Sequence, residues 1–269
     1  RTHGCKLNQA DSDTIARQFI ETGYRLVNSV SEADVFVLNT CTVTANADAK
    51  ARQVLRAVRR ANPTAIIIAA GCYSQRAAQE LQELEAVSLV IDNTHKYDLV
   101  SQVVALHSSS STPLPNPDPV GTEGPNAFSV IAAGTRRSRA MIKIQEGCNQ
   151  VCAYCIVPKV RGRERSIPPE TIIEEINNVV EQGCQEVVLT GTQLGTYGFD
   201  LDGANLHRLL SRILDETAVG RLRVSSLQAQ EISEELLELW GNSRMCPHFH
   251  VPLQSGSDRN LRAMRRRYD

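Results

Sequence analysis

The sequence has 269 residues, of which 42% are hydrophobic and 22% are charged, with 16 Gly and 11 Pro. These proportions are typical of a globular protein, so they exclude a disordered chain, a collagen and a small disulfide-stapled scaffold. The formal charge is −1, so a nucleic acid would have to be bound by local basic patches. No apolar run approaches the ~18 residues of a membrane span. We expect a cytoplasmic protein that contacts no membrane.

The first part of the chain predicts an open parallel-sheet α/β domain over residues 1–107, because short apolar runs alternate with amphipathic stretches. The runs expected as strands are residues 24–27, 35–39, 65–70 and 89–91. The stretches expected as helices are residues 12–22, 48–61, 74–84 and 96–107. Residues 108–126 then hold five of the eleven prolines. This composition predicts a Pro/Ser-rich linker over residues 108–135.

The alternation resumes in residues 136–269. Strands are expected near residues 140–145, 186–190, 221–225 and 248–251, with helices between them. Pro168 and Pro169 open one of these helices, and Gly183 ends it. Four βα units are too few to close a barrel of eight. The second domain is therefore predicted to be an incomplete (β/α) barrel. We also expect residues to be missing before Arg1, which stands where a Met would begin a chain.

Three cysteines follow the first strand of this second domain, with the spacing C-x-x-x-C-x-x-C: Cys148, Cys152 and Cys155. A structural zinc site needs a fourth ligand, normally from a second C-x-x-C pair, and the sequence has no such pair. An iron–sulfur cluster held by three cysteines leaves one iron open to an exogenous ligand, which suits catalysis. The pattern favours a catalytic iron–sulfur cluster over a zinc site or a passive cluster.

A second set of cysteines is spread over the first domain. Cys5, Cys41 and Cys72 each come directly after an expected strand, at separations of 36 and 31 residues. The carboxyl ends of parallel strands share one edge of a sheet, so the three thiols are expected to converge there. The alternative is that each packs as a small buried hydrophobic residue, which is the interpretation we prefer for Cys184 and Cys246. His248 and His250 have no third ligand nearby and are not expected to bind a metal.

The chain resembles a known family at several motifs: THGCKLNQADSD, VLNTCTVT, AAGCYSQR, EGCNQVCAYCIVPKVRGRERS and CPHFHVPLQSGSD. The spacing of the second-domain cysteines is similar to that of radical S-adenosylmethionine (SAM) enzymes. Together, the two cysteine sets resemble the methylthiotransferases of that superfamily. The residues beside Cys5 and the segments RGRERS and CPHFHVPLQSGS are most similar to the branch that acts on threonylcarbamoyladenosine in tRNA.

This resemblance implies two [4Fe–4S] clusters, with Cys148, Cys152 and Cys155 holding the radical-generating one and Cys5, Cys41 and Cys72 an auxiliary one. It implies that SAM serves as radical source and methyl donor, and that a methylthio group is installed at C2 of adenosine 37. Tyr154 matches the position whose aromatic ring lies near the SAM adenine. The implied partners are the tRNA anticodon stem-loop and an electron donor such as flavodoxin or ferredoxin. Family members continue past the position of Asp269 with further strands and an RNA-binding domain.

Further contacts are predicted from position. Residues after strands in the second domain are candidates to bind SAM: Thr190, Gly191, Gln193, Ser225, Gln254 and Ser257. Residues 130–165 carry eight basic and two acidic side chains, so Arg161, Arg163 and Arg165 are candidate phosphate contacts. Two other arginine groups, at residues 52–60 and 262–267, are expected to be solvated helix faces or a further RNA contact. Two functions stay open: methylthiolation of isopentenyladenosine in tRNA or of a ribosomal-protein aspartate, and a non-catalytic, metal-folded RNA-binding module.

Overall fold

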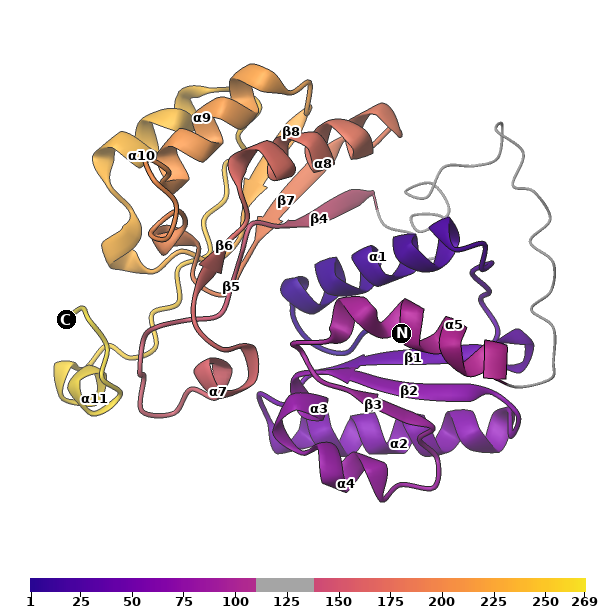
Figure 1. Ribbon diagram of the computed structural model, residues 1–269. Helices are drawn as coiled ribbons and strands as arrows, with labels where there is room; N and C mark the ends of the chain where they lie inside the picture. Colours follow the sequence, from indigo (N-terminus) through magenta and orange to yellow (C-terminus); the bar gives the residue numbers. More distant parts are fainter. Residues whose placement is uncertain (110–137) are drawn as a thin grey trace. The chain divides into compact units, whose positions relative to one another are not determined.

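The computed structural model describes residues 1–109 and 138–269. The chain divides into two compact units, Arg1–Arg136 and Arg137–Asp269, which are treated separately below (Figure 1). The linker predicted over residues 108–135 lies outside the described residues, except for Ser108 and Ser109, which end a helix.

The first unit has an α/β fold in which three parallel strands pair in the order β1-β2-β3. Its main elements are α1 (Lys6–Glu21), β1 (Val35–Thr40), α2 (Ala45–Ala61), β2 (Ile66–Gly71), α3 (Cys72–Arg76), α4 (Ala78–Gln82), β3 (Leu89–Ile91) and α5 (Leu99–Ser109). Short 3-10 turns, η1 (Val30–Glu32) and η2 (Lys96–Asp98), precede β1 and α5. Thr2 adds an isolated parallel bridge to Asn39 of β1.

The central strand β2 separates two cores, because successive side chains of a strand point to opposite faces. Ile67 packs with Leu55 of α2 on one face. Ile68 packs with Phe19 of α1 and Val103 of α5 on the other. Figure 1 shows α1 and α5 together over one face of the sheet and α2 over the opposite face. The sheet is therefore covered on both faces, and its strand ends are the part left to form a site.

Some expected elements of this unit differ in the structure. Residues 24–27 form no strand, because Tyr24 instead packs edge-on against Phe19, with ring centroids 5.1 Å apart. Helix α1 begins at Lys6, well before the expected residue 12, and Cys5 is its N-cap residue. The helix expected over residues 74–84 is broken at Ala77, whose ψ of 55° is not helical.

The second unit holds a parallel sheet of order β4-β7-β8 and a short antiparallel pair, β5-β6. Its elements are β4 (Arg139–Lys143), β5 (Gln145–Glu146), α7 (Val157–Arg161), β6 (Arg165–Ser166), α8 (Pro169–Glu181), β7 (Glu186–Thr190), η3 (Leu194–Thr196), α9 (Leu206–Glu216), β8 (Arg221–Val224), η4 (Ala229–Glu231), α10 (Glu234–Glu238), η5 (Leu239–Gly241) and α11 (Asp258–Ala263). The strand expected over residues 248–251 is reduced to a single bridge between Ser226 and His250. Within the described residues the sheet remains open.

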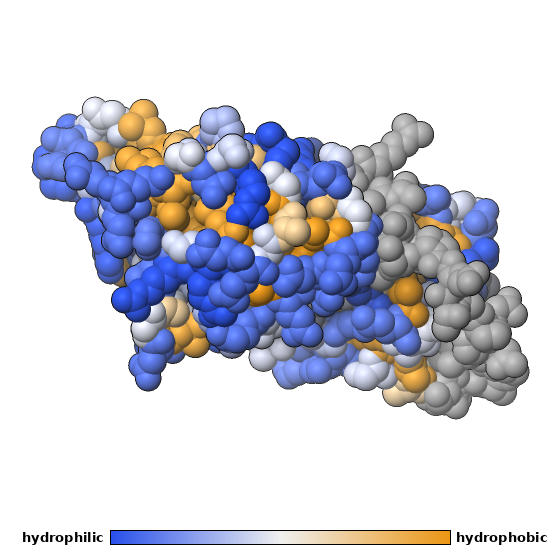
Figure 2. Space-filling view, turned by 90° about the horizontal axis from the view of Figure 1, so that it is seen from above, coloured by the Kyte–Doolittle hydropathy of each residue, from blue (hydrophilic) through white to orange (hydrophobic). Residues whose placement is uncertain are grey.

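The described helices include none that is both long and apolar enough to cross a membrane. Figure 2 shows one face of the molecule, on which hydrophilic residues predominate and hydrophobic residues gather in separate patches. Large hydrophobic side chains that remain exposed include Val151 and Tyr154 of the cysteine loop, with exposed fractions of 71% and 54%. The cysteine loop of the second unit is therefore open to solvent at Val151 and Tyr154, where a ligand can reach it.

Candidate functional site

In the first unit, the structure places the three expected cysteines at one edge of the sheet. Thr40 pairs with Gly71 in the β1–β2 register, so Cys41 and Cys72 directly follow two paired residues. Cys5 follows the bridge between Thr2 and Asn39. A Cβ atom at Gly4 would lie 2.9 Å from the Cβ atom of Cys41, so the residue before Cys5 lies against Cys41. Sheet topology therefore brings the three segments to one edge of the sheet, while the convergence of the three thiols on one site stays a prediction.

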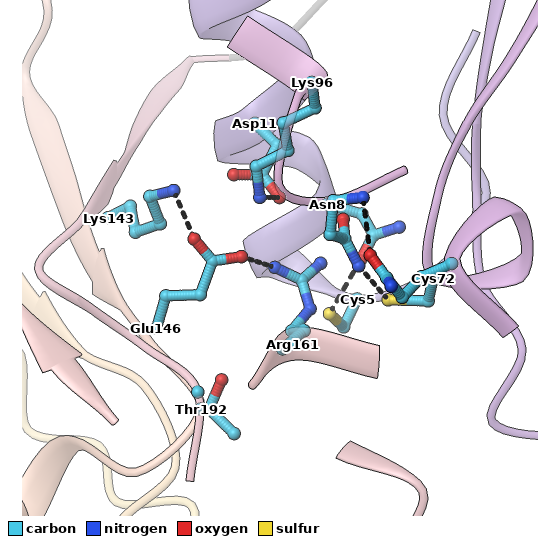
Figure 3. A network of polar contacts seen from close by, with 12 residues as sticks. Cys5, Asn8, Asp11, Cys72, Lys96, Lys143, Glu146, Arg161 and Thr192 are labelled. Carbon is cyan, nitrogen blue, oxygen red and sulfur yellow. Dashed lines mark hydrogen bonds and ion pairs between the residues drawn. The ribbon is translucent and has the colours of Figure 1, made fainter. Parts of the chain in front are cut away.

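Two asparagines contact these cysteines, and sequence reasoning missed both. The Cys5 thiol donates to Oδ1 of Asn8 at 3.4 Å, and the Asn8 amide in turn donates to the backbone oxygen of Thr40 at 2.9 Å (Figure 3). Asn93, which follows β3, donates from Nδ2 to the sulfur of Cys72 at 3.6 Å. The Cys72 and Asn93 side chains are both buried. Hydrogen bonds of this kind orient metal ligands and tune the metal that they hold.

The second unit carries its cysteines on an excursion of the chain, residues 147–164, that is closed by strand pairing. Glu146 of β5 pairs with Arg165 of β6, and the Cys148 backbone N–H donates to the oxygen of Gly162 at 3.2 Å. Gly147 has a φ of 80°, and a Cβ atom there would overlap the carbonyl oxygen of Arg163. A glycine is thus required where the loop leaves the strand.

A chain of buried ion pairs supports the base of this loop. The carboxylate of Glu146 accepts from Nη1 of Arg161 at 2.7 Å and from Nζ of Lys143 at 3.0 Å (Figure 3). The side chain of Arg161 is only 3% exposed. The expected phosphate contact does not suit this residue, because its guanidinium is buried inside the loop. Arg163 and Arg165 are exposed.

The loop cysteines have the chemistry of metal ligands. Burial raises the pKa of the Cys148 thiol; the nearby Glu164, Cys155 and Cys152 add to the rise, and a hydrogen bond from the Gln150 backbone opposes it. Three thiolates brought together at one site would repel one another, and a cationic iron–sulfur centre would remove that repulsion. All eight cysteines are free thiols. In residues 1–109 and 138–269, no three His, Cys, Asp or Glu side chains are already grouped to hold a metal ion. The fit to a cluster therefore rests on the donor set, which has the thiolates that such clusters require.

Buried hydroxyl groups mark the strand ends of the second unit. Thr192 follows β7 and Ser225 follows β8, and the side-chain oxygen of each is buried without a hydrogen-bond partner among the described residues. A buried polar atom without a partner is costly, so a polar ligand at these strand ends would be stabilised by them. Ser225 was among the SAM-binding candidates. Thr192 was not, although it lies between two residues that were.

The other SAM-binding candidates have varied surroundings. Thr190 is buried at the end of β7. The space that a Cβ atom would take at Gly191 is filled by Leu194 and by Gln145, so this glycine serves internal packing. Gln193 is buried and hydrogen-bonded through its side chain to Glu231 and Gln228. Three candidates are solvent-facing: Tyr154, Gln254, whose φ is 60°, and Ser257.

The burial of the two remaining cysteines agrees with a packing role. Cys184 and Cys246 are each 2% exposed, as packing residues are. The Cys184 thiol donates to the backbone oxygen of Glu186 at 3.2 Å. Nδ1 of His250 shares a hydrogen bond with the Ser226 hydroxyl at 2.7 Å.

Two family models match the chain. Residues 1–92 match the uncharacterized protein family UPF0004, and residues 142–269 match the radical SAM superfamily. The matched residues include Cys5, Cys41 and Cys72 in the first case and the cysteine loop in the second.

The chain is similar to curated relatives over 98–100% of its length. It is 39% identical over 268 residues to the threonylcarbamoyladenosine tRNA methylthiotransferase MtaB of Aquifex aeolicus, and 37% identical over 270 residues to that of Bacillus subtilis. It is also 35% identical over 274 residues to the tRNA-2-methylthio-N(6)-dimethylallyladenosine synthase of Syntrophobacter fumaroxidans. The chain spans 65%, 59% and 60% of the length of these three relatives.

Solved structures support the fold. The radical SAM methyltransferase TsrM from Kitasatospora setae, with tryptophan substrate and a SAM analog bound, superposes with a TM-score of 0.54 at 17% identity, over 95% of this chain and 53% of that one. A second TsrM structure, with cobalamin and a [4Fe-4S] cluster bound, gives a TM-score of 0.55. The two family matches in this order, together with similarity over nearly the whole chain, confirm the resemblance to the radical SAM methylthiotransferases.

Proposed function

We propose that the protein installs a methylthio group at C2 of N6-threonylcarbamoyladenosine 37 in tRNA, as a transferase of sulfur-containing groups that uses radical SAM chemistry. One observation carries this proposal: each unit has its own set of three free cysteines, which lie on the loop after β5 in the second unit and follow the ends of parallel strands in the first. Such strand ends are where ligands bind in open α/β sheets. The names of the Aquifex and Bacillus relatives support the substrate.

In this proposal, Cys148, Cys152 and Cys155 hold the radical-generating cluster, and Cys5, Cys41 and Cys72 hold the auxiliary cluster. When bound, two [4Fe–4S] clusters and SAM would supply the electron, the radical, the methyl group and the sulfur atom. The chain's own residues bind and orient. The buried hydroxyls of Thr192 and Ser225 would accept polar groups of SAM, and the exposed ring of Tyr154 offers a face for its adenine.

The proposed RNA contact is made by two exposed residues: Arg165, on the strand β6 that closes the cysteine loop, and Arg163, which comes two residues before it in the loop. Their charge suits the phosphate backbone of the tRNA anticodon stem-loop. The proposal also includes an electron donor such as flavodoxin or ferredoxin and a location in the cytoplasm, where tRNA is modified. Methylthiolation of dimethylallyladenosine is the second candidate, supported by the 35% identity to the Syntrophobacter enzyme.

Iron content after anaerobic reconstitution tests the two cluster sites. We expect about eight irons per chain, as two [4Fe–4S] clusters require, and about four after either Cys152→Ala or Cys41→Ala. Only Cys152→Ala should abolish formation of 5′-deoxyadenosine from SAM. Cys184→Ala removes a buried thiol that belongs to neither set and is the matched control. Stoichiometric zinc without iron would support the non-catalytic RNA-binding module instead.

The substrate is tested by mass spectrometry of tRNA nucleosides from cells that lack and then regain the full-length protein. We expect the methylthio derivative of threonylcarbamoyladenosine to disappear and return; loss of the dimethylallyladenosine derivative would select the second candidate. For RNA binding, Arg163→Gln with Arg165→Gln should lower the slope of log K against log salt by roughly 0.7–0.9 per lost phosphate contact. The double variant Arg56→Gln and Arg60→Gln, on an exposed face of α2, controls for net charge. Equal slopes for the two double variants would refute this contact.

A further inference from the structure

The segment after α11 folds back in a defined turn. Helix α11 ends at Ala263, and the backbone N–H of Arg265 donates to the oxygen of Arg262 at 3.0 Å. The N–H of Arg266 donates to the oxygen of Leu261 at 2.9 Å, and Leu261 is buried. These two bonds form a Schellman motif, in which the residue after the C-cap is left-handed and is usually glycine. Here Arg265 adopts that conformation, with a φ of 56°. The turn therefore fixes the direction in which the next residue, Arg266, leaves the helix.

Arg266 reaches the cysteine loop of the same unit. Its Nη1 donates to the sulfur of Cys152 at 3.4 Å, and its Nη2 donates to Oε1 of Gln228 at 2.7 Å. The guanidinium carbon lies 5.1 Å from the centre of the Tyr268 ring. A second contact is made by the backbone, because the N–H of Ala153 donates to the oxygen of Met264 at 3.1 Å. The turn thus holds the loop at two neighbouring residues, Cys152 and Ala153.

This environment separates Arg266 from the arginines around it. Arg262, Arg265 and Arg267 are exposed, whereas Arg266 is half-buried. The sequence predicted one basic group over residues 262–267, either solvated or bound to RNA. Arg266 fits neither use, since its Nη1 and Nη2 groups are already directed at Cys152 and Gln228.

A guanidinium is well suited to donate hydrogen bonds to a cysteine thiolate that holds a cluster. It stays charged at any ordinary pH and presents several N–H donors in a rigid fork, so it can bond a thiolate and a second acceptor together. Hydrogen bonds and positive charge at the sulfurs of an iron–sulfur cluster stabilise its reduced form, which carries more negative charge. Such a donor makes the cluster easier to reduce. Reduction is the step that radical SAM chemistry needs before SAM is cleaved.

We propose that Arg266 is a positioning residue of the radical SAM site: it holds the Cys152 side of the loop in place and raises the reduction potential of the cluster bound there. This inference rests on the proposed function, because it assumes a cluster on Cys148, Cys152 and Cys155.

The test is an anaerobic redox titration, monitored by electron paramagnetic resonance, of the reconstituted full chain without SAM. A Cys41→Ala background leaves only the radical SAM cluster to be measured. The comparison is made at the potential where half of the clusters in the protein with Arg266 are reduced. At that potential, Arg266→Gln should lower the ratio of reduced to oxidised cluster about tenfold, which corresponds to a reduction potential lower by ~59 mV for one electron. Arg266→Lys, which keeps the charge but loses the fork, should shift the potential less. Arg267→Gln removes an exposed neighbouring charge and should leave the potential unchanged.

Hydrogen exchange of the apo protein gives a second measurement that needs no cluster. The peptide covering residues 150–156 should exchange faster in Arg266→Gln than in the wild type and in Arg267→Gln, because the turn no longer holds the loop. An unchanged potential in Arg266→Gln, an equal shift in Arg267→Gln, or unchanged exchange would each overturn the inference. A wild type that takes up no iron would overturn the proposed function instead, and exchange would still decide whether Arg266 holds the loop.

Discussion

The carboxyl group of Glu164 is expected to make the stability of the second unit depend on pH. Its residue is 7% exposed, and burial raises its pKa from 4.5 to about 7. The nearby carboxylates of Asp200 and Glu231 add to the rise, while the Asn149 backbone and Arg267 oppose it. Below both values, the folded and unfolded chains are equally protonated. As pH rises from about 4.5 to about 7 the unfolded chain loses its proton first, so folding stability falls through this window and then levels off.

The substitution Glu164→Gln removes this titration. The difference between the two pKa values corresponds to a total change of ~3 kcal/mol in the free energy of unfolding. About 2–3 kcal/mol of this change occurs between pH 5 and pH 8. Urea unfolding at these two pH values measures it, followed by the fluorescence of Trp240, the only tryptophan, which lies in the second unit. Between pH 5 and pH 8, the free energy of unfolding of the wild type should fall by about 2–3 kcal/mol more than that of Glu164→Gln. The exposed Glu181→Gln is the control. Parallel pH dependences of wild type and Glu164→Gln would refute the reasoning.

The sequence predicted best those features that depend on short-range pattern. The bounds of β3 and β7 agree with the expected strands, because their apolar runs end in turn residues on both sides. The placing of Cys41 and Cys72 at one sheet edge followed from strand order alone, since parallel strands end side by side. The strand expected over residues 24–27 does not form. Residues with strand propensity form a strand only where another strand is available to pair, and Tyr24 packs on Phe19 instead.

Side-chain partners were harder to predict, because they depend on segments far apart in the sequence. Arg161 looked like part of a basic surface run, but the loop turns it inward against Glu146, fifteen residues away. The contact of Arg266 with Cys152 joins residues 114 positions apart, and no local pattern indicates it. Asn8 could have been found: it lies three residues after Cys5 in the first turn of α1, and residues at that spacing share a helix face.

Two further predictions concern the frame around each cysteine set. Gly147→Ala should abolish iron binding at the loop of the second unit, since the added Cβ atom would overlap the Arg163 backbone. The control is Gly162→Ala, because Gly162 has a φ of 73° but open space where a Cβ atom would lie. This variant should retain the iron, which distinguishes the effect of backbone strain from that of overlap. In the first unit, Lys96→Met should lower the free energy of unfolding by about 3–5 kcal/mol, because Nζ of Lys96 lies 3.0 Å from Oδ2 of Asp11 and both side chains are almost fully buried (Figure 3). The Asp11 carboxylate would keep the Tyr97 hydroxyl at 2.8 Å but lose the charge of Lys96. Because Lys96→Met takes its positive charge away from the buried carboxylate of Asp11, the double variant Lys96→Met with Asp11→Leu, which removes that carboxylate as well, should be more stable than Lys96→Met alone. Circular dichroism in urea measures both, since Trp240 does not report on the first unit; a double variant less stable than the single one would show that the pair contributes more than the burial of its two charges costs.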